Sequence, residues 1–289
     1  MLFDPECIPC IINQAYNAAK LFTDGNKELQ FKIVKDACEA VLSIEGDSSA
    51  PVFSSAIQNS IENTLGVINP YQKLKEENLI KAGRFIKYLE TMVENSEDKL
   101  ESAVSAAIIG NTIDLGANPN FDIEAEVNKI TSNNIDEQTF SKFKEDLNSA
   151  SSVLYIGDNY EEALFDKILI NQMLPREVVF AVRSRPILND ITLADAEYLK
   201  IDNTCEVIES GSMIAGTDLN QCSQKFRDLF EQADLVIAKG QGNFETLMYS
   251  QRPVYFLFKV KCEAISRRCG FPVGSSVLYL NNKNYNPDK

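Results

Sequence analysis

Short apolar segments alternate with helical patterns in the second half of the chain, and this alternation constrains the fold more than any other feature. The segments span residues 153–157, 177–182, 205–210, 233–239, 253–258 and 275–280. Strands that read as continuous apolar runs are buried on both faces, which is typical of a parallel sheet covered by helices on each side. We therefore predict an α/β domain with a mostly parallel sheet over residues 98–289.

The first part of the chain has a different pattern and predicts an all-helical domain over residues 1–97. Apolar residues recur there at spacings of three and four, which is the period of one helix face. The segments 28–43 and 51–64 repeat that pattern, and Asn69-Pro70 interrupts it. A long amphipathic helix is expected after the proline, and a shorter one over residues 140–147.

Composition excludes several classes of function. The formal net charge of the 289 residues is −14, which argues against nucleic acid as the main partner. The chain has no histidine, so catalytic triads that need histidine and histidine-ligated zinc are excluded. The N-terminus does not resemble a signal peptide, and no apolar run approaches the roughly 18–20 residues of a membrane helix. Seven cysteines, an odd number, fit free thiols in a cytoplasmic protein.

Polar residues follow five of the predicted strands, at the edge where parallel sheets bind ligands. They are Asp158 and Asn159 after the first, Arg183, Arg185 and Asp190 after the second, Ser212 after the third, Lys239 to Asn243 after the fourth, and Lys259 and Lys261 after the fifth. The oxygen donors suit a divalent cation such as Mg²⁺ or Mn²⁺, and the lysines suit a phosphate beside it. Gly240 and Gly242 would let backbone N–H groups approach that phosphate. Each such residue taken alone could simply cap a helix, as Asn243 could.

An ordered set of motifs resembles the damage-control phosphatases, also called domain-of-unknown-function family 89, and most closely their short prokaryotic branch. The motifs are "CIPCIINQA", "NPYQKLKEENLIKA", "AAIIGNTIDLG", "GDNYEEALFDKILI", "PILNDIT", "AGTDL", "KGQGNFETL" and "KVKCEAI". Together they run over nearly the whole chain. The resemblance implies a helical N-terminal domain on a three-layer α/β/α, Rossmann-like domain.

The resemblance also implies a metal-dependent phosphatase acting on small phosphorylated metabolites, such as sugar phosphates, with Mg, Mn, Co or Ni. It places the metal on Asp158, Asn159 and Asp190, and a turn over residues 110–116 would bring Asn111 and Asp114 to the same pocket. We expect Asp158, Asp190, Asp114 and Lys261 to be catalytic. We expect Asn111, Lys239, Gly240, Gly242, Asn243, Arg185 and Lys261 to bind substrate. The nucleophile could be water or Asp158.

The sequence departs from the family pattern at three places that could narrow or weaken the pocket. Tyr160-Glu161 replaces the usual Ala-Gly, Ser184-Arg185 replaces Gly-Gly, and Met213 replaces an aspartate. Two alternative functions stay open for this reason. One is a carboxyl methyltransferase that uses S-adenosylmethionine, although the first strand lacks a glycine-rich loop. The other is a catalytically weak metabolite-binding protein.

Cys7 and Cys10 are three residues apart on a predicted helix and therefore lie on one face. A structural zinc site would need two more ligands, and the sequence offers no second cysteine pair and no histidine. Packing of these thiols between helices is the main interpretation, and a redox or shared metal role is the alternative.

Overall fold

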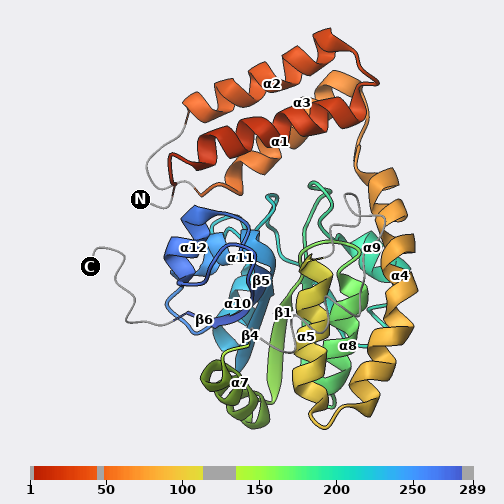
Figure 1. Ribbon diagram of the computed structural model, residues 1–289, viewed down its shortest axis with the longest axis vertical. Helices are drawn as coiled ribbons and strands as arrows, with labels where there is room; N and C mark the ends of the chain where they lie inside the picture. Colours follow the sequence, from red (N-terminus) through yellow and green to blue (C-terminus); the bar gives the residue numbers. More distant parts are fainter. Residues whose placement is uncertain (1–2, 44–48, 113–134, 282–289) are drawn as a thin grey trace.

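The structure is a computed structural model, and it describes residues 3–43, 49–112 and 135–281. Three helices, α1 (Cys7–Phe22), α2 (Lys27–Leu42) and α3 (Val52–Leu65), form a separate layer above the α/β part of the molecule (Figure 1). Their apolar faces share one small core that includes Ile11, Ala15, Ile33 and Ile57. The predicted helical segment at the N-terminus is confirmed.

A long helix, α4 (Gln72–Asn95), leads from this layer down one side of the α/β part, as Figure 1 shows. Its buried residues Ala82, Leu89 and Val93 belong to the same core as the sheet. The division between the two cores therefore falls earlier in the chain than residue 97. Leu74, near the start of α4, packs against the N-terminal core, so this helix contacts both cores.

Helix α5 (Lys99–Thr112) was missed by the sequence analysis, which expected a turn from residue 110. The segment from Ala103 to Ile109 is fully buried because α5 packs against both α8 (Ala163–Met173) and the strand β5 (Tyr255–Lys259). A helix buried on all sides lacks the amphipathic period that marks surface helices. Helix α7 (Glu137–Ser149) contains the predicted segment 140–147, and the side chain of Asp136 caps its start.

Six strands form one sheet in the order β3-β2-β1-β4-β5-β6. They are β1 (Ser152–Ile156), β2 (Glu177–Val182), β3 (Glu206–Glu209), β4 (Leu235–Lys239), β5 (Tyr255–Lys259) and β6 (Ser276–Leu280). The first five pair in parallel, and β6 is antiparallel to β5. Each strand overlaps one of the six predicted apolar segments, so the mostly parallel sheet is confirmed.

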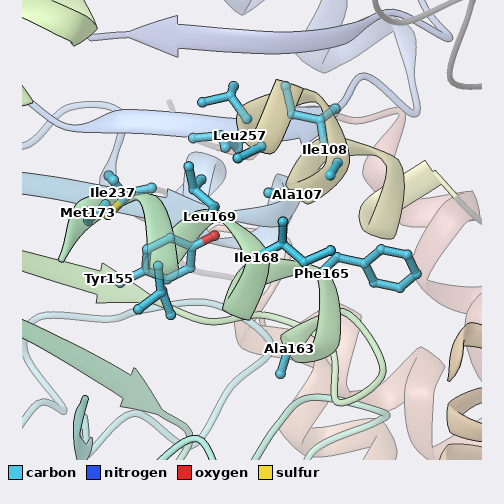
Figure 2. Packing of buried hydrophobic residues seen from close by; sticks show 14 of the residues in the cluster. Ala107, Ile108, Tyr155, Ala163, Phe165, Ile168, Leu169, Met173, Ile237 and Leu257 are labelled. Carbon is cyan, nitrogen blue, oxygen red and sulfur yellow. The ribbon is translucent and has the colours of Figure 1, made fainter. Parts of the chain in front are cut away.

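Alternate strand residues point to opposite helical layers. Tyr155 of β1 belongs to the core under α5 and α8, whereas Ile156 belongs to the core on the other face. Figure 2 shows the first of these cores, where side chains of α5, α8 and strands β1, β4 and β5 gather. The other face is covered by α10 (Gln224–Gln232), α11 (Gly240–Leu247) and α12 (Glu263–Cys269). This is the three-layer α/β/α arrangement.

The strand order reverses between β1 and β4, because the chain runs outward from β1 to β3 and returns to β4. Ligands of open α/β sheets bind at this switch point, outside the carboxyl ends of the strands. The α1–α3 layer lies above that edge (Figure 1). Hydrogen bonds join the two, since Arg185 Nη2 donates to Glu62 Oε2 at 3.0 Å and Ala215 N donates to Ser54 Oγ at 2.8 Å.

In the part of the chain that the structure describes, no helix combines the length and apolar character needed to cross a membrane.

Candidate active site

Asp158 and Asn159, which follow β1, lie beside Asp190, which comes at the end of the loop after β2. The loop after β2 folds back, and its end forms an antiparallel bridge between Asn159 and Asp190. Backbone hydrogen bonds fix this register, with Ile191 N donating to Asp158 O at 2.8 Å and Tyr160 N donating to Asn189 O at 2.9 Å. The structure thus brings together the three residues that were predicted to hold a metal ion.

A buried arginine, Arg183, connects the two carboxylates. Its Nε donates to Asp190 Oδ2 at 2.7 Å, and its Nη2 lies 3.7 Å from Asp158 Oδ1. The sequence analysis assigned Arg185, not Arg183, to substrate, and that role stays a prediction. The Arg185 guanidinium binds Asn59 and Glu62 of α3, each at 3.0 Å, and so joins the helical layer to the loop.

The carboxylate of Asp158 rests on the first residue of α11. A Cβ atom built at Gly240 would lie 1.8 Å from Asp158 Oδ2, and Gly240 has φ +79°. Only glycine permits both the close approach and this backbone conformation. Gly240 is therefore needed for the position of Asp158. The start of a helix also favours a carboxylate electrostatically.

Asn243, which was predicted to bind substrate and could have capped α11, lies within that helix, whose N-cap residue is Lys239. It is fully buried in α11, where its Oδ1 accepts from Arg183 Nη2 at 3.1 Å and its Nδ2 donates to Gly157 O at 3.1 Å. It therefore holds Arg183 against the end of β1. Gly242 permits packing too, because an added Cβ would lie 2.1 Å from the backbone oxygen of Ala215.

Lys239 was predicted to bind substrate, and the structure places its side chain among buried carboxylates. Its side chain is fully buried, with Nζ 2.5 Å from Asp166 Oδ1 and 3.2 Å from Glu162 Oε2. Tyr155 donates a second hydrogen bond to Asp166 at 2.7 Å. Glu162 in turn accepts from Asn159 Nδ2 at 2.5 Å. Lys239 therefore supports the site from beneath, through Glu162.

Lys261 is the predicted phosphate ligand whose side chain remains exposed. It follows β5, and its backbone N donates to Gln241 Oε1 at 2.9 Å, so it lies against the start of α11. Its positive charge acts on Asp158. For Asn111, which lies in the last turn of α5, the structure describes the backbone only. Asp114 lies outside the described residues.

The residues that were expected to narrow the pocket lie elsewhere or at its margin. Tyr160 is buried in the core beneath α8, with Lys75 Nζ 5.0 Å from the centre of its ring. Lys75 is itself fully buried and donates to Asp190 O at 3.0 Å and to Asp195 Oδ2 at 2.5 Å. Met213 is 48% exposed in the loop after β3.

The electrostatics of the site reflect an excess of buried carboxylates. Burial raises the pKa of Asp158 well above its usual value, and Asp190 and Glu162 raise it further, whereas Arg183 and Lys261 oppose the rise. Burial also raises the pKa of Asp190, against the effect of Arg183 and Lys75. Two neighbouring carboxylates that resist ionisation in this way are the arrangement that a bound cation would stabilise.

The donor atoms fit a divalent cation. Asn159 Oδ1 and Asp190 Oδ1 accept no hydrogen bond from the residues that the structure describes. No three acidic or cysteine side chains in the described ranges form a metal cage, so two carboxylates and one amide would have to share the ion with solvent or phosphate. This donor set is typical of Mg²⁺ and Mn²⁺, which retain open positions for substrate oxygens.

Comparison with known proteins agrees with this geometry. The model of the damage-control phosphatase ARMT1-like domain matches residues 3–277. The chain belongs to the damage-control phosphatase family. A damage-control phosphatase of Pyrococcus horikoshii is 32% identical, with 96% of this chain and 97% of that protein aligned. A damage-control phosphatase of Archaeoglobus fulgidus is 30% identical, with 96% and 98% aligned.

An uncharacterized protein of Methanocaldococcus jannaschii is 36% identical over 95% of this chain and 94% of its own length. Among solved structures, a DUF89 family protein from Pyrococcus horikoshii superposes with a TM-score of 0.82. It is 28% identical and covers 97% of this chain and 99% of its own. The family resemblance seen in the sequence motifs is therefore confirmed. The fold that the resemblance implied for this chain is confirmed as well.

Cys7 and Cys10 lie at the start of α1 as free thiols, Cys7 half-buried and Cys10 exposed. Burial raises the pKa of both thiols, and the nearby Cys262 and Glu245 raise it further. A raised pKa does not favour the thiolate that metal binding and redox chemistry use. The half-buried Cys7 fits the packing interpretation, whereas Cys10 is exposed, so the role of the pair stays a prediction.

Proposed function

We propose that this protein is a metal-dependent phosphatase that hydrolyses small phosphorylated metabolites. One observation carries the proposal. Two ion-paired groups of buried side chains lie on either side of Asn159, one of Arg183 with Asp158 and Asp190, and one of Lys239 with Glu162 and Asp166. In each group one cation contacts two carboxylates, so a divalent cation at Asp158 and Asp190 would supply positive charge that these carboxylates favour.

Burying an uncompensated charge costs several kcal/mol, and proteins keep such clusters where a cation or a reaction requires them. Asp158, Asn159 and Asp190 would hold the ion, which would supply positive charge opposite the phosphoryl oxygens. Membership in the damage-control phosphatase family supports the same reaction.

The residues around the ion site have separate tasks in this proposal. Lys261 binds phosphoryl oxygens from the rim and stabilises the charge that develops on them during transfer. Arg183 holds Asp158 and Asp190 in their orientations, because it contacts both. In one route Asp190 accepts a proton from the attacking water while the phosphorus–oxygen bond to the leaving alcohol breaks. In the other route Asp158 attacks phosphorus and displaces the alcohol, and water then hydrolyses the aspartyl phosphate to release phosphate.

The structure gives little support to the two alternative functions. The turn between β1 and α8 contains one glycine, Gly157, and a Cβ atom added there would meet Phe180 and Ile191, so this turn does not form a glycine-rich loop for a nucleotide cofactor. Tyr160 is a core residue and Arg185 pairs with Glu62, so neither blocks the ion site. We do not propose methyl transfer or a degenerate pocket.

An activity assay with a matched pair of variants tests the proposal. Wild-type protein should release phosphate from an aryl phosphate when Mg²⁺, Mn²⁺, Co²⁺ or Ni²⁺ is present, and Asp158→Ala should abolish this release while the protein stays folded. Asp234→Ala is the control, because Asp234 binds Ser151 and Ser152 at the opposite end of β1. Full metal-dependent activity in Asp158→Ala would refute the assignment. If the activity is lost as expected, a panel of phosphorylated metabolites would define the substrate class.

A further inference from the structure

The amide of Asn159 has an orientation that its neighbour Glu162 determines. Asn159 Nδ2 donates to Glu162 Oε1 at 2.5 Å. A carboxylate accepts hydrogen bonds and donates none, so it selects the amide nitrogen over the amide oxygen. The oxygen of Asn159 then points away from Glu162, and it accepts no hydrogen bond from the described residues.

Glu162 is itself held from the other side. It is 1% exposed, and Lys239 Nζ donates to its second carboxylate oxygen, Oε2, at 3.2 Å. Lys239 ends β4, and its ammonium is fixed further by Asp166 at 2.5 Å. A row of ionic hydrogen bonds therefore runs from the end of β4 to the amide after β1, and none of its side chains except Asn159 reaches the surface.

From this contact we propose that Glu162, supported by Lys239, is a positioning residue that turns the Asn159 amide so that its oxygen faces the divalent cation. The inference rests on the proposed function, because it requires an ion at Asp158, Asn159 and Asp190. An amide rotated by half a turn would present its N–H group to the cation and would be repelled. Groups that orient metal ligands in this way change metal affinity by roughly 10- to 100-fold when they are removed.

The isosteric variant Glu162→Gln tests the orientation. The lysine needs an acceptor, so the glutamine oxygen turns to Lys239 and the glutamine N–H group turns to Asn159. The asparagine must then offer its oxygen to Gln at position 162 and its nitrogen to the ion. We expect Mn²⁺ affinity, measured by calorimetry or by electron paramagnetic resonance without substrate, to fall roughly 10- to 100-fold.

Glu161→Gln is the matched control, since Glu161 is the neighbouring residue and is also buried but binds Asn78 and Asn189 instead of Asn159. Its Mn²⁺ affinity should stay within about twofold of wild type, as expected for a residue outside the ligand-orienting contacts.

A second substitution provides the rescue that a purely structural role would not give. When Asn159→Asp is added to Glu162→Gln, the new carboxylate has two oxygen atoms. One oxygen accepts a hydrogen bond from the glutamine, and the other faces the ion. Mn²⁺ affinity should return to within about threefold of wild type. Asn159→Asp alone sets two carboxylates against each other and should bind more weakly than the double variant.

The outcomes separate this inference from the proposed function. If wild-type protein binds no Mn²⁺, the proposed function fails and the positioning role fails with it. If wild-type protein binds Mn²⁺ but Glu162→Gln binds it equally well, only the positioning role is refuted. The same holds if the double variant binds no better than Glu162→Gln, while circular dichroism shows that all variants are folded.

Discussion

Replacement of Glu161 by glutamine should stabilise the protein at alkaline pH. Glu161 is only 7% exposed, and its Oε1 accepts from Asn78 Nδ2 at 3.2 Å and from Asn189 Nδ2 at 3.3 Å. Its Oε2 and the Oδ1 of Asn78 are both buried, and neither has a hydrogen-bond partner among the residues that the structure describes. Burial raises the pKa of Glu161 from 4.5 to about 7. A glutamine removes the buried charge and adds a donor for the Asn78 oxygen.

The sign of the effect follows from proton linkage. The folded state holds the proton of Glu161 more tightly than the unfolded state, so the stability that this group contributes is present below about pH 4.5 and is lost as the pH rises to about 7. One pKa unit corresponds to about 1.4 kcal/mol, and the full effect is therefore about 3 kcal/mol at about pH 8. Between about pH 5.5 and pH 8 the change is about 2 kcal/mol.

Urea unfolding of metal-free wild type and Glu161→Gln at these two pH values measures the difference directly. The advantage of the variant in unfolding free energy should grow by about 2 kcal/mol from the lower to the higher pH. Other titrating groups contribute equally to both proteins and cancel. A difference that does not change with pH, or one that shrinks, would refute the reasoning about burial of this carboxyl group.

Three further substitutions have distinct expected results. Gly240→Ala should displace Asp158 and abolish Mn²⁺ binding. Gly25→Ala is its control, because Gly25 has a similar φ of +82° but open space where a Cβ would lie, and this variant should lose only about 1 kcal/mol of stability. Equal Mn²⁺ affinity in the two variants would contradict this prediction. Lys239→Met leaves buried carboxylates uncompensated and should lower the unfolding free energy by about 3–5 kcal/mol in urea titrations; a stable variant would show that these acids are protonated. Lys261→Met should lower kcat/KM for an aryl phosphate at least about tenfold without changing Mn²⁺ affinity; unchanged kinetics would remove Lys261 from the phosphate site.

The sheet and the position of the site could be predicted because both follow from strand patterns. Buried parallel strands leave apolar runs in the sequence, and their carboxyl ends must share one edge. Helix α5 left no such signal, because a helix buried on all sides lacks an amphipathic period. Asp158, Asn159 and Asp190 meet because the loop after β2 folds back, which the sequence pattern alone does not describe.

The roles of Lys239 and Arg183 could have been found from the strand period of two. Leu235 and Ile237 face the α8 side of the sheet, so Lys239, two residues further along β4, points to the same side and meets Glu162. Arg183 continues β2 on the opposite side, where α11 lies. Grouping cations by the strand they follow, without the direction of their side chains, therefore did not separate Lys239 from Lys261 or Arg183 from Arg185.

The most direct test of the metal site is anomalous diffraction from a crystal soaked with Mn²⁺. The account predicts one strong peak within coordination distance of Asp158, of Asn159 Oδ1 and of Asp190. A peak at another place, with Mn²⁺-dependent phosphatase activity intact in the same preparation, would contradict it.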